Sequence, residues 1–264
     1  MLLCQFMYRI KTYDEFLGEN LWADLQDRSS GEVTRKENYI TTREELDELI
    51  MTEYEKQGQG DTLHLDFTGK KILVKDLSHL FKEYIHLHVL SGLETWDVSQ
   101  VENMYSLFYN FKYIKELNIG NWDTRNVIGM GGMFENCRFL EKLDIGNWNT
   151  GQVRDMSWMF NGCNSLEELH IENWDVSQVI RMAGMFRNCI NLKNLDIKNW
   201  DVSQVADMKN MFVNCMDLTD LDLTGWTLND KIKIDDLDAN IMFRNCPVWY
   251  VKRGNKFVKY EKVK

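Results

Sequence analysis

The stretch "NWDVSQV" occupies residues 173–179 and occurs again, letter for letter, at residues 199–205. A near copy, "TWDVSQV", occupies residues 95–101. A fixed period of this kind is typical of a stacked repeat array, in which each unit packs only against its neighbours. A β-propeller blade needs about 40–45 residues, so the Trp-Asp pairs do not predict a propeller. The tryptophan of this stretch recurs every 26 residues, at Trp96, Trp122, Trp148, Trp174, Trp200 and Trp226.

Within one period the hydrophobic pattern changes from that of a strand to that of a helix. Leu195 and Ile197 are two residues apart, as on one face of a strand, and a polar turn follows Trp200. The apolar residues that come next have the i, i+3, i+4, i+7 spacing of one helix face. They are Met208, Met211, Phe212 and Cys215. We therefore predict that each repeat, or coil, is a short strand, a turn and a short helix.

The chain ends depart from the period and predict caps. Thr42 and Glu45 form a capping box, which predicts a helix from there to about Tyr54. Strand-like segments flank Gly254-Asn255, which predicts a hairpin. We expect about six 26-residue strand-turn-helix coils, a degenerate first coil and end caps. The expected segments are an N-terminal extension (1–38), a cap helix (39–62), a repeat solenoid (63–246) and a C-terminal cap hairpin (247–264).

The segment "LEKLDIGNWNTGQVRDMSWMFNGCNSLEELHIENWDVSQV", residues 140–179, resembles the BspA-like leucine-rich repeat family of bacterial surface proteins. Trp-Asp-Val-Ser/Thr-x-Val followed by Met-x-x-Met-Phe-x-x-Cys is its signature, and the resemblance covers roughly residues 63–246. It implies an α/β, right-handed leucine-rich-repeat-like solenoid. It also implies a non-enzymatic adhesion or interaction protein at the cell surface.

Charge and hydropathy narrow the classes of partner. The chain has 264 residues and a net charge of -10, which disfavours nucleic acid because phosphate binding relies on Lys and Arg. No run approaches the roughly 20 apolar residues of a membrane helix, so we expect no membrane insertion. The stretch "MLLCQFMYRIK" lacks a basic n-region and a long apolar core. We therefore expect no secretory signal or anchor, and a protein that is cytoplasmic or exported by a non-classical route.

The residues that alternate with the buried strand leucines are the candidate binding surface. If the Leu and Ile side chains point inward, these residues point outward along the concave face of the strands. They are mostly acidic and differ between coils, which suits a binding surface on a constant frame. The alternative is a solvated face that keeps the array soluble. The predicted partner-binding residues are Glu116, Asn118, Lys142, Asp144, Glu168, His170, Glu172, Asn194, Asp196, Lys198, Asp220 and Asp222.

Two other repeated residue types are interpreted as structural. The tryptophans offer a stacking platform for sugars or bases, but identical placement in every coil favours packing. Five cysteines occupy one repeat position without a C-x-x-C pair, which favours buried, reduced thiols over a metal or disulfide ladder. The histidines of the first coil lack a spaced set of Cys or carboxylate ligands, so we expect no metal and no cofactor. The cysteines are Cys137, Cys163, Cys189, Cys215 and Cys246, and the histidines are His64, His79, His86 and His88.

The function we expect is a non-catalytic protein–protein interaction or adhesion module, with a host or surface protein as partner. One alternative is a glycan-binding or glycan-hydrolysing protein that uses outward carboxylates. Glu168 and Glu172 share a strand face, but at about 3.3 Å per residue they are about 13 Å apart, beyond the usual catalytic pair. The other alternative is a structural, self-assembling array.

Overall fold

The structure, a computed structural model, describes residues 39–229, 232 and 242–259. The chain divides into two units, Met1–Glu37 and Asn38–Lys264, and the described residues lie in the second. The predicted N-terminal extension, residues 1–38, lies outside the described residues. In chain order the described elements are β1 (Tyr39–Ile40), α2 (Arg43–Lys56), β2 (Thr62–His64), β3 (Lys71–Ile72), β4 (Val89–Ser91), the 3₁₀ helix η3 (Leu93–Thr95), β5 (Glu116–Leu117), β6 (Lys142–Leu143), β7 (Asn194–Leu195), β8 (Asp220–Leu221), β9 (Tyr250–Arg253) and β10 (Lys256–Lys259).

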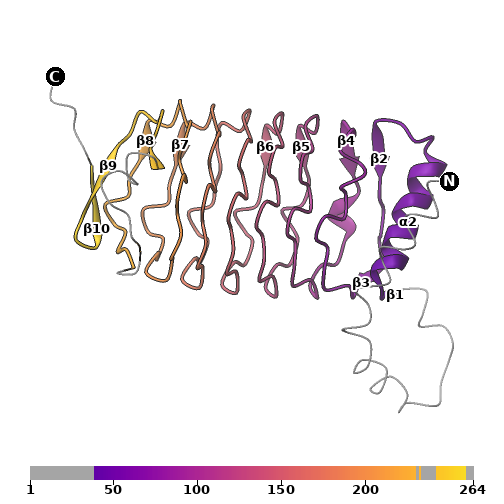
Figure 1. The fold of residues 1–264 in the computed structure, drawn as a ribbon. Coiled ribbons are helices and arrows are strands. Elements are labelled where there is room, and N and C mark those ends of the chain that lie inside the picture. The colour runs from indigo at the N-terminus through magenta and orange to yellow at the C-terminus, as the bar shows by residue number, and fades with distance from the viewer. Residues whose placement is uncertain (1–38, 230–231, 233–241, 260–264) are drawn as a thin grey trace, which may run out of the picture. The chain divides into compact units, whose positions relative to one another are not determined.

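The short strands of neighbouring coils pair in parallel, one period apart. In β5 and β6, Glu116 faces Lys142, and in β7 and β8, Asn194 faces Asp220. Glu168 bridges in parallel to Asn194, so the coil between β6 and β7 contributes to the same row. We call this row, from β5 to β8, the strand row. Figure 1 shows the coils side by side along the stack, and a parallel ladder sets about 4.8 Å per coil.

A second parallel row runs along another side of each coil. Asn103, Gly129, Asp155, Arg181 and Asp207, each 26 residues after the one before, form successive parallel bridges. Each of these bridging residues lies seven residues after the repeated tryptophan of its own coil. The coils are therefore joined by backbone hydrogen bonds on two sides, which fixes the register of each coil against the next.

The short helix predicted for each coil is wrong. Turns occupy the segment from Met208 to Cys215 and its equivalents in the other coils. The backbone amides of this segment donate across the stack instead of back along a helix, as from Met130 to Asp155 O (3.0 Å) and from Phe134 to Met159 O (2.9 Å). Other amides of the same segment donate to the carbonyl three residues earlier, as from Cys137 to Phe134 O (3.1 Å).

Left-handed residues explain why the helical spacing does not produce a helix. Asn136 and Gly132 have φ values of 63° and 62°, and Asn110, Asn188 and Asn214 also have positive φ. Glycine and asparagine adopt this conformation most easily, and each such residue interrupts a right-handed helix. The i, i+3, i+4, i+7 pattern still places the apolar residues inside, because two tight turns bring them to the same side of the coil.

The interior is filled by columns of identical side chains. Phe134, Phe160 and Phe186 stack with ring centroids 5.6 and 5.7 Å apart and interplanar angles of 6° and 7°. Trp122, Trp148 and Trp174 form a parallel column next to them, with centroids 6.3 and 6.4 Å apart. All six repeated tryptophans are buried. Because each aromatic ring stacks on the same ring of the next coil, the aromatic residues of the repeat vary little between coils.

Each tryptophan also fixes the corner between two coils. The indole Nε1 of Trp148 donates to Ile119 O (3.0 Å), and that of Trp174 donates to Ile145 O (3.0 Å). The other four tryptophans make the equivalent bond to the coil before them. A buried indole N–H requires such an acceptor, so the tryptophan contributes both apolar area and a cross-coil hydrogen bond.

Different elements close the two ends of the stack. The Thr42 hydroxyl accepts from the Glu45 amide at the start of α2, and α2 buries Leu46 and Ile50. At the other end β9 and β10 pair antiparallel and bury Tyr250 and Phe257. Figure 1 places α2 beside the first coil and the hairpin of β9 and β10 beside the last. A repeat array requires closing elements of this kind at both ends, because they cover the interior of the terminal coils.

Candidate interaction surface on the strand row

The predicted partner-binding residues lie together along the strand row, where the backbone alternation turns them away from the interior. Leu143 and Leu195 point inward and are buried, whereas the residues on either side of each are exposed. Asp222 is half-buried and the rest of the predicted set is exposed. We call this surface, formed by the twelve residues predicted above, the strand face.

Most of the lysines on and beside the strand face form ion pairs with acidic side chains of a neighbouring coil. Lys198 Nζ lies 2.7 Å from Asp222 Oδ2. Two further pairs lie one residue before the strands, where Lys115 Nζ is 3.1 Å from Glu141 Oε1 and Lys193 Nζ contacts Glu167. Sequence reasoning omitted these flanking residues. Their signal was a change of charge sign at one repeat position in successive coils.

The ion pair of Lys198 and Asp222 shifts the pKa of both side chains. The hydrogen bond from Lys198, together with those from the hydroxyl and the amide of Thr224, lowers the pKa of Asp222 to about 2. The hydrogen bond to Asp222 raises the pKa of Lys198 in turn. Both side chains remain partly exposed, at 51% and 40%, so solvent screens much of this attraction.

Several strand-face carboxylates form no ion pair within the described residues. Within the described part of the chain, Asp144, Glu172 and Asp196 form no ion pair, and neither do Glu116 and Asp220. Glu168 lies 3.8 Å from His170 of the same coil, a contact that becomes an ion pair only when the histidine is protonated. The strand face therefore has surplus negative charge, directed outward from a rigid backbone.

The described residues show no cluster suited to holding a metal. No group of three or more His, Cys, Asp or Glu side chains comes together in the ranges 39–229 and 242–259. The first-coil histidines bind separate partners: His86 Nε2 lies 2.7 Å from the Tyr54 hydroxyl, and His64 Nδ1 lies 3.0 Å from Ser91 Oγ. The structure thus does not bring these histidines together as a ligand set.

The column of cysteines lies in the interior as free thiols. Cys163 Sγ donates to Phe134 O (3.2 Å), and Cys189 Sγ donates to Phe160 O (3.1 Å). Burial raises the pKa of Cys137 and of Cys189 to about 12, so these thiols stay protonated at neutral pH. A protonated thiol that already donates to a carbonyl is a poor metal ligand and a poor nucleophile.

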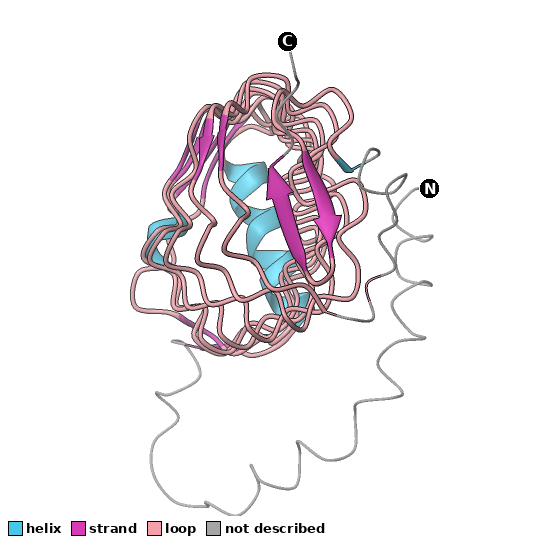
Figure 2. Cartoon of the chain, turned by 90° about the vertical axis from the view of Figure 1, so that its left-hand side faces the viewer, coloured by secondary structure: helices cyan, strands magenta, loops and turns pink. Residues whose placement is uncertain are grey.

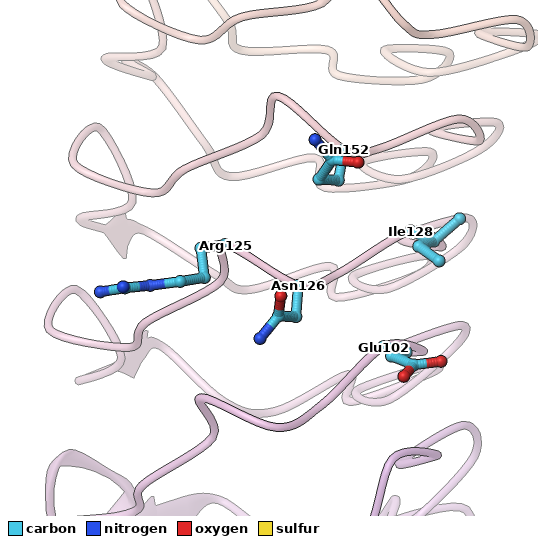
Figure 3. A pocket seen from close by; sticks show the side chains of 5 residues that line it. All are labelled: Glu102, Arg125, Asn126, Ile128 and Gln152. Atoms are coloured by element: carbon cyan, nitrogen blue, oxygen red, sulfur yellow. The ribbon is translucent and has the colours of Figure 1, made fainter.

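A hollow of about 380 Å³ lies away from the strand face, at the corner that follows the repeated tryptophan. Figure 3 shows that Glu102, Ile128 and Gln152 line it from three successive coils, together with Arg125 and Asn126. Its charged side chains already have partners: Glu102 pairs with a lysine at 2.7 Å and Arg125 with an aspartate at 2.8 Å. Sequence reasoning missed this hollow, whose signal is the exposed isoleucine at residue 128. It offers a single carboxylate, so it does not supply the paired acids of a glycosidase.

No helix within the described residues combines the length and the apolar character needed to cross a bilayer. The comparison with curated proteins found no match. One family matches the chain twice, over residues 75–168 and 140–248, so that the two matches together span most of the coils. The chain therefore belongs to the family described as "Mycoplasma protein of unknown function, DUF285", a family of repeat type.

Proposed function

We propose that the chain is a non-catalytic interaction module that binds a basic protein partner through the strand face. The observation that carries this proposal is the surplus of unpaired carboxylates on a rigid row of strands. Asp144, Glu172 and Asp196 form no ion pair within the described part of the chain, while Lys115 and Lys198 are held by acidic neighbours. Clefts and faces of one charge sign steer partners of the opposite sign.

The contrast between constant and variable positions supports the same proposal. The inward position of the strand row is leucine in every coil, from Leu117 to Leu221. The outward position next to it changes from Asn118 through Asp144 and His170 to aspartate again. A face that only had to stay soluble does not require this coil-by-coil variation, whereas recognition of a particular partner does.

At the finer level, we propose that the chain is of the BspA-like leucine-rich repeat type, with the right-handed solenoid and the adhesive or interaction role that this type implies. The repeated Trp-Asp-Val-Ser signature and the two parallel rows of coil pairing support this proposal. We further propose that the partner is a host or surface protein.

The test is capture of partners by three forms of the full chain. The first is the unmodified chain, and the second carries lysines in place of three unpaired strand-face carboxylates, Asp144→Lys, Glu172→Lys and Asp196→Lys. The third is a matched control that reverses three exposed carboxylates elsewhere that form no ion pair within the described residues, Glu48→Lys, Glu55→Lys and Glu83→Lys. Each form is incubated with cell lysate and with purified surface proteins, and bound proteins are identified by mass spectrometry.

We expect the unmodified chain and the control to capture the same basic protein, and the strand-face variant to lose it. Capture should weaken as salt rises, because exposed charges are screened beyond about 10 Å at 0.1 M salt. Equal capture by all three forms would refute the strand face as the binding site. If none of the forms captures a protein, a glycan array becomes the next experiment and the protein-partner assignment is withdrawn.

A further inference from the structure

The outward side of α2 has two acidic residues and one apolar residue in a row. Glu44, Glu48 and Met51 follow the i, i+4, i+7 spacing of one helix face, opposite to the buried Leu46 and Ile50. Glu44 and Glu48 are exposed, and Met51 is 46% exposed. We call these three residues the helix-end patch.

The cations of α2 do not neutralise the acidic residues of the helix-end patch, because they pair with other acids of the helix. Arg43 Nε lies 3.0 Å from Asp47, and Lys56 Nζ lies 2.8 Å from Glu53. These are the two cations of α2, and each is occupied by an acid of the same helix. Glu44 and Glu48 form no ion pair within the described residues, so this end of the stack has uncompensated negative charge.

The hairpin at the other end has the opposite charge. Residues 242–259 contain five Lys and Arg and no Asp or Glu. In the pairing of β9 and β10, Phe257 faces the interior, so the neighbouring pairs, Arg253 with Lys256 and Val251 with Val258, face outward. Val258 is 47% exposed. We call these four outward residues the hairpin-end patch.

The two patches lie on elements at opposite ends of one stack, and these elements partly overlap when the stack is viewed end-on. Figure 1 places α2 and the hairpin at the two ends of the row of coils. In Figure 2, which looks along the stack, both elements project over the interior of the coils. A second copy displaced along the stack direction therefore brings its hairpin-end patch opposite the helix-end patch of the first.

We propose that copies of this chain associate head to tail, with the hairpin-end patch of one copy on the helix-end patch of the next. Arg253 and Lys256 then face Glu44 and Glu48, and Val258 packs against Met51. The contact joins two different surfaces, so it leaves a free patch at each end and builds an open chain of copies, not a closed dimer. This inference does not depend on the strand face, which stays uncovered along the side of such a chain.

The opposing explanation is that charged ends serve only to keep a single copy soluble, as lysines on edge strands do. The two explanations differ in the charges that they require of the two ends of the stack. Protection against aggregation is served equally well by ends of the same sign, which repel each other. Ends of opposite sign attract, and an exposed apolar residue in each patch is out of place on a purely protective cap.

The first experiment is sedimentation velocity of the full chain over about a hundredfold range of protein concentration. At about 20 mM salt, we expect the weight-average mass to rise with concentration by at least about twofold, without stopping at a dimer. At about 0.5 M salt the mass should return to that of the monomer, because charges are screened within a few ångströms. A constant monomer mass at low salt would overturn the proposal, and a mass that stops at the dimer would replace it with a closed contact.

Charge-reversed variants identify the surfaces. Glu44→Lys with Glu48→Lys reverses the helix-end patch, and Arg253→Glu with Lys256→Glu reverses the hairpin-end patch. Each variant alone should remain monomeric at low salt, because its two ends then have the same sign of charge. Mixing the two variants should restore association, since each now meets an end of opposite sign.

Two matched variants control for net charge. Asp144→Lys with Glu172→Lys changes the net charge as the helix-end variant does, and Arg154→Glu with Lys209→Glu changes it as the hairpin-end variant does. Both controls should associate like the unmodified chain. The proposal is wrong if a control loses association as fully as the end variants do, or if the mixture of end variants stays monomeric. Loss of partner capture by the strand-face variant would leave this result unaffected, so the two proposals fail separately.

Discussion

The indole ring of Trp158 covers Gly184 of the next coil so closely that a Cβ at Gly184 would lie 2.4 Å from Cε3 of the indole. Trp158 has a φ of 61° and Gly184 a φ of 62°, both in the left-handed region. Ser106 and Asn210 occupy the same repeat position in other coils. A tryptophan at this position therefore requires a neighbour without a side chain.

Gly184→Ala should destabilise the protein by about 1–3 kcal/mol from overpacking, in addition to about 1–2 kcal/mol for a left-handed alanine. In a Trp158→Asn background, the overpacking cost should disappear and only the backbone cost should remain. Urea denaturation of the four forms gives the coupling between the two sites. Equal costs of Gly184→Ala in both backgrounds would show that the indole does not lie over this glycine in solution.

The ion pair of Lys198 and Asp222 should make stability depend on pH in the acid range. The pKa of Asp222 is lowered from 3.8 to about 2, so its contribution is complete above about pH 4 and is lost as the pH falls through 2. Because the pair is partly exposed, we expect a small effect. Asp222→Asn should lower the free energy of unfolding at pH 6 and by clearly less at pH 2, where about half of the carboxyl is protonated in the folded protein, as measured by urea denaturation at each pH. An equally large difference at pH 2 would contradict the ion-pair origin.

The buried thiols should be unreactive in the folded protein. Burial raises the pKa of Cys189 to about 12 and that of Cys246 to about 11, so little thiolate is present at pH 8. In a Cys4→Ser background, a thiol-specific reagent should label no cysteine of the native chain within minutes and five after unfolding. Fast labelling of one thiol without denaturant would mean that the column opens locally at that coil.

The phenylalanine column should account for a large share of stability. Phe160 stacks between Phe134 and Phe186 at 5.6 and 5.7 Å, so Phe160→Ala should cost about 3–5 kcal/mol. Phe139 is 50% exposed, and Phe139→Ala should change the free energy of unfolding by less than about 0.5 kcal/mol. Denaturant unfolding followed by circular dichroism measures both. Similar costs for the two variants would show that the column is not the main source of stability.

The sequence predicts much of this architecture because the apolar positions repeat so regularly. The 26-residue spacing of Trp96 and its equivalents sets the period, and parallel bridges such as Gly129 to Asp155 have the same offset. The capping box at Thr42 likewise marks the start of α2, because the signature is local and its hydrogen bond is made within four residues.

The predicted helix failed because apolar spacing does not report where the backbone amides donate. Met208 and Phe212 are buried with either a helix or two tight turns, so their spacing cannot distinguish the two. The recurrent Asn or Gly near the end of the segment, as at Asn188, was the available signal, because it favours a left-handed residue.

For the candidate surface, the outward residues follow from strand alternation, but the ion pairs depend on side-chain geometry between coils. Lys198 and Asp222 are 24 residues apart, which no local pattern connects.

The two rows of coil-to-coil hydrogen bonds also determine how the length of this protein can change. Every bond in them joins residues about one period apart, as Arg154 to Ile128 O does. Excision of one whole period, such as residues 148–173, leaves each remaining coil with a neighbour that offers donors and acceptors at the same places. Loss of a single residue instead shifts one row against the other and turns buried side chains outward. Gene duplication and deletion in units of one coil can therefore lengthen or shorten the outward surface while both closing elements stay the same.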